Sequence, residues 1–211
     1  MVAHGSDAWS LDQLAGATVA HYDSNAQGFF AGTRDHDVSQ NIGALLEAIT
    51  APAPFAILDL GCGPGRDLVT FTRLGHRATG LDGSAQFVAM ARALSGCEVW
   101  HQSFLHLALP PSSFDGVFAN ASLFHVPRAA LPAVLAQLCA TLTPGGVLFS
   151  SNPRGQNQEG WSGERYGAYH DYPAWKAYVE AAGFVEVGHY YRPPGLPRAQ
   201  QPWLASVWRK L

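Results

Sequence analysis

Short apolar runs alternate with helical patterns along most of this 211-residue chain. The runs have the length of buried strands and fall at residues 55–60, 76–82, 97–104, 114–119, 147–151, 184–191 and 203–208. Helical periodicity fills the intervals, at residues 66–74, 84–95, 128–142 and 173–182. Strands that alternate with helices predict a parallel α/β sheet. No boundary interrupts the pattern, so we expect a single domain over residues 1–211.

About fifty residues precede the first strand. We expect a short helix over residues 11–20 and an amphipathic helix over residues 37–49, and the segment between them contains Tyr22, Phe29 and Phe30. Residues 1–50 are therefore expected to form a helical leader before a core at 55–211. The leader either folds over a ligand as a lid or packs its aromatic residues on the sheet.

Residues 152–172 differ from the rest of the chain, because they are polar, rich in glycine and contain four aromatic residues. No strand or helix period is visible, and we expect a long loop. Loops of this length inside a domain are usually functional, so this segment is expected to help build a substrate site.

A glycine loop follows the first strand. Residues 55–67 read FAILDLGCGPGRD, in which Gly61, Gly63 and Gly65 separate an apolar run from a helical pattern. Glycine allows tight turns and lets a ligand approach the backbone closely. A strand, a glycine loop and a helix together are typical of nucleotide binding, because N–H groups at the helix start point at the ligand.

Two kinds of nucleotide compete for this loop. The dinucleotide pattern GxGxxG places its third glycine at position 66, where this chain has Arg66. Asp59 precedes the loop, where a carboxylate suits a ligand with an ammonium group, and Asp82 ends the second strand, where it can bind ribose hydroxyls. These residues favour a nucleoside that carries an ammonium group and no pyrophosphate over a dinucleotide.

Several segments resemble the class I S-adenosylmethionine-dependent methyltransferases. DLGCGPG followed by GLD resembles their first two motifs, FDGVFANASLFHVP their fourth-strand motif, and LTPGGVLFSSNP the turn and strand that follow. The resemblance covers residues 55–153. It implies a Rossmann-like, seven-stranded, mostly parallel sheet whose last strand is antiparallel, with S-adenosylmethionine as the cofactor.

The resemblance also implies roles for individual residues. Asp82 and Gly83 would bind the ribose and flank the adenine, and Asp59 would lie near the amino group of the cofactor. The remaining cofactor-binding candidates lie in the leader, in the glycine loop and at the ends of the third and fourth strands: Tyr22, Gly61, Cys62, Gly63, Gly65, Ser103, Phe104, Asn120 and Ala121. Many relatives carry an acid near residues 102–104 to accept the adenine amino group, and this chain has none there.

Methyl transfer from a sulfonium is an in-line displacement, and an enzyme contributes mainly by positioning the acceptor and excluding water. A general base is needed only when the acceptor must lose a proton. The candidates for that base are His125, Tyr166 and His170. The candidates for the substrate pocket are apolar walls and carboxylate-binding arginines, namely Phe29, Phe30, Arg34, Arg154, Trp161 and Arg165.

The leader and the tail are also similar to small stand-alone bacterial methyltransferases and to the methyltransferase portion of ovothiol synthases. That similarity implies N-methylation of a thiohistidine or another imidazole, thiol or amine derivative of an amino acid. An NAD-dependent oxidoreductase and a non-catalytic cofactor-binding module are the alternatives. The first is disfavoured by Arg66 at the position of the third glycine, whereas nothing in the sequence excludes the second.

Composition and charge limit the partners, the metal sites and the cell compartment that we expect for this chain. A net charge of -3 and the lack of a Lys/Arg run give no reason to expect nucleic acid as a partner. Three cysteines without metal-type spacing fit a reducing interior, and no apolar segment reaches membrane-spanning length, so we expect a cytoplasmic protein without a metal site. A small molecule is the expected partner.

Overall fold

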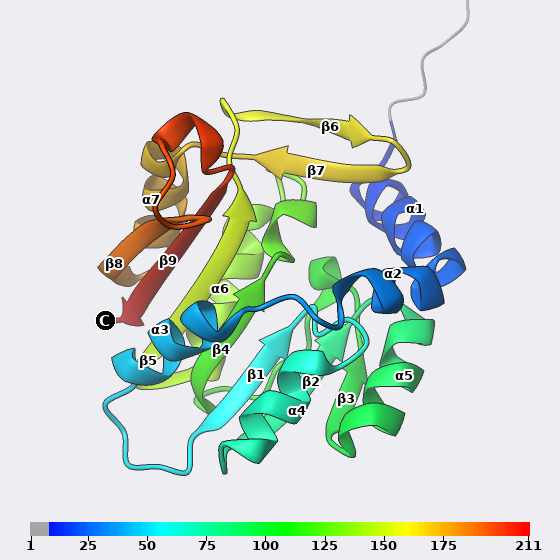
Figure 1. The fold of residues 1–211 in the computed structure, drawn as a ribbon. Coiled ribbons are helices and arrows are strands. Elements are labelled where there is room, and N and C mark those ends of the chain that lie inside the picture. The colour runs from blue at the N-terminus through cyan, green and yellow to red at the C-terminus, as the bar shows by residue number, and fades with distance from the viewer. Residues whose placement is uncertain (1–8) are drawn as a thin grey trace, which may run out of the picture.

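A computed structural model describes residues 9–211 and shows one central seven-stranded sheet (Figure 1). The strands run in the order β3-β2-β1-β4-β5-β9-β8. All neighbouring pairs from β3 to β5 are parallel, and β9 is antiparallel to both β5 and β8. Their bounds are β1 (Ala56–Leu60), β2 (Arg77–Asp82), β3 (Glu98–His101), β4 (Phe114–Asn120), β5 (Leu142–Pro153), β8 (Phe184–Arg192) and β9 (Trp203–Lys210). The predicted Rossmann-like sheet with an antiparallel last strand is confirmed.

Helices cover both faces of this sheet (Figure 1). One face carries α3 (Ser39–Ala48), α4 (Arg66–Arg73) and α5 (Ala85–Ser95), and the other carries α6 (Leu131–Thr141) and α7 (Tyr172–Ala181). Three short 3₁₀ helices lie in the connections: η1 (Phe104–His106), η2 (Leu123–His125) and η3 (Arg198–Gln200). Among the described residues, no helix has the length and apolar composition needed to cross a membrane.

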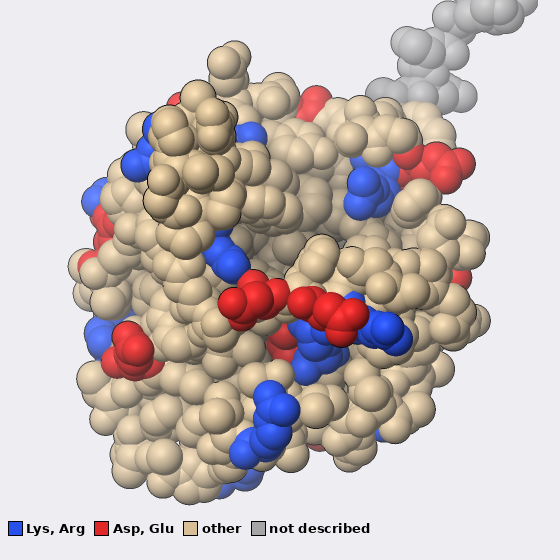
Figure 2. Space-filling view, viewed as in Figure 1, with Lys and Arg blue, Asp and Glu red and all other residues tan. Residues whose placement is uncertain are grey.

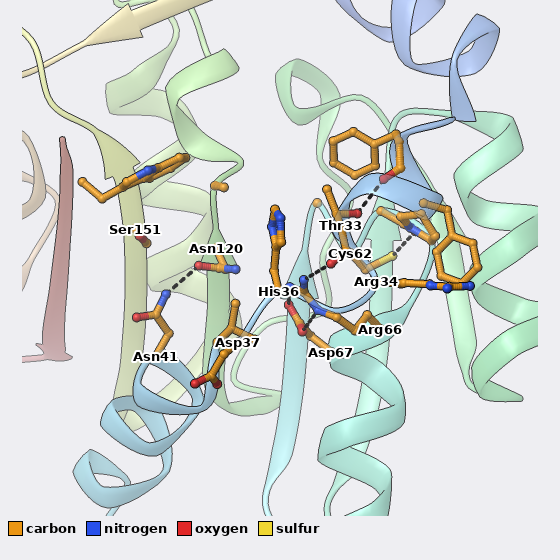
Figure 3. A pocket seen from close by; sticks show the side chains of 18 of the residues that line it. Thr33, Arg34, His36, Asp37, Asn41, Cys62, Arg66, Asp67, Asn120 and Ser151 are labelled. Atoms are coloured by element: carbon orange, nitrogen blue, oxygen red, sulfur yellow. Dashed lines mark hydrogen bonds and ion pairs between the residues drawn. The ribbon is translucent and has the colours of Figure 1, made fainter. Parts of the chain in front are cut away.

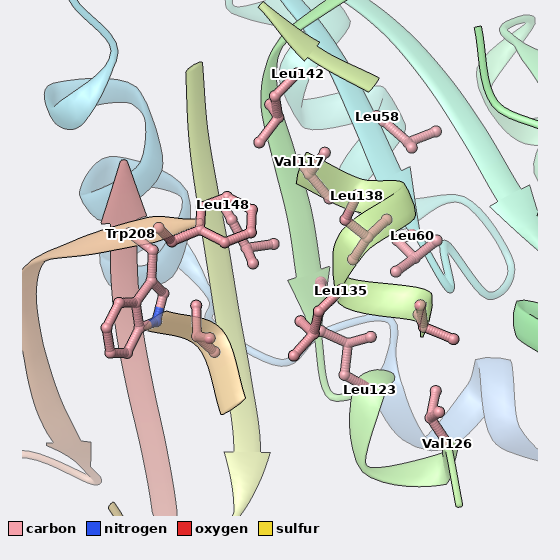
Figure 4. Packing of buried hydrophobic residues seen from close by; sticks show 14 of the residues in the cluster. Leu58, Leu60, Val117, Leu123, Val126, Leu135, Leu138, Leu142, Leu148 and Trp208 are labelled. Carbon is pink, nitrogen blue, oxygen red and sulfur yellow. The ribbon is translucent and has the colours of Figure 1, made fainter. Parts of the chain in front are cut away.

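Alternation along the central strands divides the core between the two faces. In β1, Leu58 and Leu60 pack toward α6, whereas Ile57 packs with α3 on the opposite face. Figure 4 shows Leu135 and Leu138 of α6 meeting this leucine-rich face, and all of these side chains are fully buried. Parallel strands with both faces covered read as continuous apolar runs, which is why the sequence reveals them clearly.

The leader consists of α1 (Leu11–Ser24), α2 (Ala26–Thr33) and α3. The first predicted helix therefore extends four residues further, and the aromatic segment forms a helix of its own. Ser10 begins α1 as a capping box, in which its side chain accepts from the Gln13 N–H and the Gln13 side chain accepts from the Ser10 N–H. Helices α1 and α2 lie near the carboxyl ends of β1 and β2 (Figure 1).

The prediction of a loop over residues 152–172 is wrong in its centre. Two strands, β6 (Gln158–Ser162) and β7 (Arg165–Tyr169), form an antiparallel hairpin with Gly163 at its turn in a left-handed conformation (φ 61°). The hairpin packs on α1 and η2 and lies across the top of the sheet in Figure 1. Polar and glycine residues hide it in the sequence, because its stability comes from backbone pairing and contacts with distant segments rather than from an apolar face.

Candidate functional site

The glycine loop folds as a series of left-handed turns. Gly61, Gly63 and Gly65 have φ angles of 76°, 52° and 95°. A Cβ at Gly61 would lie 2.5 Å from Ser122 Cβ, and one at Gly65 would lie 2.8 Å from the Cα of Ala91. A Cβ at Gly63 would approach only Phe29 Cε1, at 3.8 Å. The first and third glycines thus allow close packing, and the second leaves its backbone open to the cavity.

Asp82 joins the glycine loop to the second strand. Its carboxylate accepts hydrogen bonds from the Gly63 N–H and the Ser84 N–H, both at 2.9 Å. Burial raises the pKa of Asp82 to about 6, against the effect of these backbone donors. The side chain lies on a small pocket of about 100 Å³ together with Gly83, Ser103 and Phe104. The structure therefore brings together the residues predicted to hold the ribose and adenine.

Asp59 lies behind the loop and faces neither of the two central cavities. It is 2% exposed, and its Oδ2 has no hydrogen-bond partner among the described residues. Burial, reinforced by the nearby Asp67 carboxylate, raises the pKa of Asp59. Asp67 does line the larger cavity, where Arg66 pairs with it at 2.7 Å. Cys62 is also on that wall, and burial raises the pKa of its thiol.

A larger cavity of about 570 Å³ adjoins the small pocket, and Figure 2 shows the surface hollowed at this place. Tyr22, Phe29, Gly61 and Ala121 line both. The predicted residues Phe30, Arg34, Asn120 and Arg165 line the larger one. A volume in this range suits a small-molecule site.

Tyr22 and His125 connect the leader to the core and to the hairpin. The Tyr22 hydroxyl lies 2.8 Å from His125 Nε2, and His125 Nδ1 lies 2.8 Å from the Tyr166 carbonyl. The carbonyl can only accept, so Nδ1 carries the proton and Nε2 accepts from Tyr22. Arg165 also donates to the Tyr22 hydroxyl, at 3.4 Å.

This arrangement favours a positioning role for His125. Burial lowers the pKa of His125 to about 4, so the ring is neutral at pH 7. The lone pair on Nε2 accepts the hydrogen bond from the Tyr22 hydroxyl. Burial raises the pKa of Tyr22. A base that serves near neutral pH has a pKa near 7 and a free lone pair facing the substrate. That His125 acts as a general base stays a prediction, and its Nε2 lone pair already accepts from the Tyr22 hydroxyl.

Four of the predicted catalytic and substrate-binding residues lie away from both central cavities, as Asp59 and Gly65 do among the predicted cofactor-binding residues. The Arg154 guanidinium donates to the carbonyls of Gln201 and Arg198, both at 2.8 Å, so it ties the chain before β9 to the end of β5. Trp161 packs edge-on against Trp9 at the hairpin tip. The Tyr166 ring packs on Trp161, so only its backbone takes part in the His125 contact. His170 is buried against Trp175 and Tyr178, and burial lowers its pKa.

The structure adds cavity residues that sequence reasoning missed, chiefly Asn41, Phe124, Arg192 and Trp203. Figure 3 shows Asn41 reaching from α3 to Asn120, on the side of the cavity away from Arg66. Strand topology could have indicated two of them. Because β9 is antiparallel, its first residue, Trp203, and the last residue of β8, Arg192, lie at the edge where the parallel strands end. Among the described residues, no group of His, Cys, Asp and Glu side chains could hold a metal ion.

Comparison with known proteins gives this architecture a context. Residues 57–146 match a family described as "Methyltransferase domain". The chain is 32% identical over 116 residues to trans-aconitate 2-methyltransferase of Azoarcus sp. (strain BH72), which covers 54% of this chain and 45% of that protein. It is 38% identical over 116 residues to ubiquinone biosynthesis O-methyltransferase of Xanthomonas axonopodis pv. citri (strain 306), covering 50% and 47%. The chain thus spans about half the length of the curated relatives it matches.

Solved structures share the fold over nearly the whole chain. Burkholderia thailandensis 1,6-didemethyltoxoflavin-N1-methyltransferase, with bound 1,6-didemethyltoxoflavin and S-adenosylhomocysteine, superposes with a TM-score of 0.77 at 21% identity, covering 98% of this chain and 92% of that one. The [4+2]-cyclase SpnF superposes with a TM-score of 0.71 at 17% identity, covering 96% and 97%. The same fold therefore occurs both in a methyltransferase and in a protein that is described as a cyclase.

Proposed function

Because the central part of the chain carries a class I S-adenosylmethionine-dependent methyltransferase domain, we propose that the whole chain transfers a methyl group from S-adenosylmethionine to a small polar metabolite. One observation carries the proposal: the pocket that has the Asp82 carboxylate in its wall adjoins a second cavity of small-molecule size. Tyr22 and Phe29 line both spaces. A donor and an acceptor would then meet beside Gly61 and Ala121, which line both spaces.

The residues present fit this cofactor. Asp82 supplies carboxylate oxygens for ribose hydroxyls, and Gly63, whose N–H donates to Asp82, leaves space beside its Cα for a ligand. Asp67 on the cavity wall is paired with Arg66, and the raised pKa of Asp59 favours its neutral form, so Asp82 is the carboxylate on the wall of the cofactor pocket. When bound, S-adenosylmethionine supplies the activated methyl group. The task of this chain is to orient the acceptor and exclude water, which can lower a barrier by about 7–11 kcal/mol.

We further propose that the acceptor carries a carboxylate. Arg165 and Arg192 line the cavity, and neither has a carboxylate within ion-pair distance among residues 9–211. Arg34 instead pairs with Asp35, and Arg66 with Asp67. Unpaired guanidinium groups bind carboxylates through two parallel hydrogen bonds. An amino-acid derivative, including the thiohistidine suggested by the leader and tail, has such a group.

Two alternatives make different predictions. An NAD-dependent oxidoreductase is disfavoured by Arg66, which occupies the position of the third glycine and is committed to Asp67 and the Thr33 carbonyl. A module that binds the cofactor without transferring its methyl group would keep the same pocket. SpnF has a similar fold and is described as a [4+2]-cyclase, so the fold alone does not decide between the enzyme and the module.

Turnover separates the enzyme from the non-catalytic module. Purified protein is incubated with a metabolite extract and S-adenosylmethionine labelled on its methyl group, with Asp82→Asn as the inactive control. We expect label in small molecules with the wild type alone. A wild type that binds S-adenosylhomocysteine yet labels nothing in extracts of several origins would favour the module.

A further inference from the structure

A chain of three hydrogen-bonding side chains crosses the wall of the larger cavity. The Tyr190 hydroxyl of β8 donates to Asn41 Oδ1 at 2.8 Å, and Asn41 Nδ2 donates to Asn120 Oδ1 at 2.8 Å. The three residues come from β8, α3 and the end of β4. Asn41, in the middle, is 1% exposed, and burial raises the pKa of Tyr190 to about 12, so its hydroxyl keeps its proton.

The direction of these bonds decides what Asn120 offers the cavity. Its carbonyl oxygen is occupied by Asn41, so the amide Nδ2 with its two N–H groups is left on the cavity side, as Figure 3 shows. Rotating the Asn120 amide alone by half a turn would set two NH₂ groups against each other. Such a contact leaves donors unpaired and costs about 1–3 kcal/mol. Rotating the Asn41 amide with it would move the Tyr190 proton to the Gln40 carbonyl, at 3.4 Å instead of 2.8 Å.

Asn120 also stands where the two spaces meet. It ends β4 and is followed by Ala121, which lines both the small pocket and the larger cavity. Asn120 itself lines only the larger cavity, on the acceptor side. Ser151 on the neighbouring strand pairs with it across the sheet.

We propose that Asn120 positions the methyl acceptor by donating hydrogen bonds to an oxygen or an unprotonated nitrogen next to the reacting atom, and that Tyr190 fixes this polarity through Asn41. The inference rests on the proposed methyl transfer and narrows its substrate class. The group that faces Asn120 is a carboxylate, a phenolate, a carbonyl or a neutral ring nitrogen. An ammonium group there would meet two N–H donors and no lone pair.

The reaction balances without a further reactant. The acceptor lone pair forms the new bond to the methyl carbon while the carbon–sulfur bond breaks and its electron pair stays on sulfur. An anionic oxygen becomes a neutral ether or ester. A neutral ring nitrogen becomes a cation, which releases a proton to solvent if it carries one.

Nitrogen-15 NMR tests the polarity without knowledge of the natural acceptor. The side-chain amide signal of Asn120 is assigned from its loss in Asn120→Asp, and the protein is titrated with benzoate and with benzylamine, two probes of similar shape and opposite charge. We expect benzoate to shift the signal at millimolar concentration and benzylamine to leave it in place. A shift with benzylamine, or none with either probe, contradicts the proposal.

Kinetics with an acceptor found in the extract screen tests the role. We expect Asn120→Asp to bind S-adenosylhomocysteine within threefold of the wild type while its kcat/KM falls at least 100-fold. Tyr190→Phe should lower kcat/KM by three- to tenfold, and by less than twofold when Asn120 is already Asp, because both changes break one chain. Tyr191→Phe is the matched control, since its hydroxyl makes no hydrogen bond within the described part of the chain, and it should behave as the wild type.

The outcomes separate this inference from the proposed function. Additive effects of Tyr190→Phe and Asn120→Asp, or loss of S-adenosylhomocysteine binding in Asn120→Asp, overturn the role of Asn120 and leave methyl transfer standing. A wild type that does not bind S-adenosylhomocysteine overturns methyl transfer, whereas the response of the Asn120 signal to benzoate still reports the polarity.

Discussion

The proposed site has two halves that are built in different ways: the small pocket around Asp82, proposed for the cofactor, and the larger cavity, proposed for the acceptor. The cofactor half uses short stretches at the ends of β1, β2 and β3, and backbone hydrogen bonds hold it together: the N–H groups of Gly61 and Cys62 donate to the Leu81 carbonyl, and that of Gly63 donates to Asp82. The acceptor half draws on the leader, on the ends of β4, β5 and β8, on the start of β9 and on the hairpin, and side chains join these parts.

The difference explains how one fold serves several substrates. Backbone contacts around the glycine loop do not depend on most side chains, so the cofactor half can stay constant. In the acceptor half, single substitutions at Asn120, Arg165 or Arg192 change the charge and hydrogen-bonding character of the cavity wall without touching the sheet. Function is set by a site carried on a shared fold.

The largest effect should come from the cofactor half, on replacing Gly65 by alanine. The left-handed φ of 95° and the contact with the Ala91 backbone together cost about 2–5 kcal/mol and displace the loop. Gly75→Ala is the matched control, because Gly75 has a φ of 87° with nothing within 4 Å of the added Cβ, and it should cost about 1 kcal/mol. Chemical denaturation measures both. Equal losses in the free energy of unfolding would show that the contact with Ala91 contributes nothing to the effect.

A pH series tests the contact between the two halves at His125. Its pKa is lowered to about 4 in the folded protein from 6.5, so the unfolded chain binds the extra proton first as pH falls. Stability from the neutral ring is complete above pH 6.5 and is lost between pH 6.5 and 4, up to about 3 kcal/mol. Asp82 has the opposite sign over nearly the same range, because its raised pKa of about 6 favours the folded state at low pH.

The variant His125→Gln separates the contribution of His125 to the pH dependence of stability from that of Asp82. The stability difference between the wild type and His125→Gln should shrink by about 2–3 kcal/mol from pH 7 to pH 4, because the variant has no imidazole to protonate. Denaturation at each pH gives the difference. A constant difference would show that His125 is not held neutral by the fold.

A smaller effect is expected in the acceptor half. Arg165→Ala and Arg192→Ala should each raise the KM of a carboxylate acceptor about 10- to 30-fold, or about 1.4–2 kcal/mol, and leave the affinity for S-adenosylhomocysteine unchanged. Arg154→Ala should lower stability with no change in KM, since its guanidinium binds the carbonyls of Gln201 and Arg198. If the Arg165 and Arg192 variants kept a normal KM, the acceptor would not need a carboxylate.

The same contrast limits what the sequence can predict. Fully buried strands such as β1 and the glycine loop have local patterns, so the α/β sheet and the loop could be predicted, whereas the antiparallel β9 and the residues around Asp82 were implied only by the resemblance to methyltransferases. The hairpin β6–β7 has no apolar period, and the Tyr190–Asn41–Asn120 chain joins residues up to 149 positions apart. Arg154 and Arg165 look alike in the sequence, and only the carbonyl groups beside Arg154 show that it has another task.

Calorimetry with S-adenosylhomocysteine and with NAD tests most directly that the cofactor half accepts a sulfonium nucleoside. We expect one S-adenosylhomocysteine per chain, no detectable NAD binding, and at least a tenfold loss of S-adenosylhomocysteine affinity in Asp82→Asn, because a neutral amide accepts ribose hydroxyls less strongly than a carboxylate. Binding of NAD in place of S-adenosylhomocysteine, or affinity that is unchanged in Asp82→Asn, would contradict this account of the site.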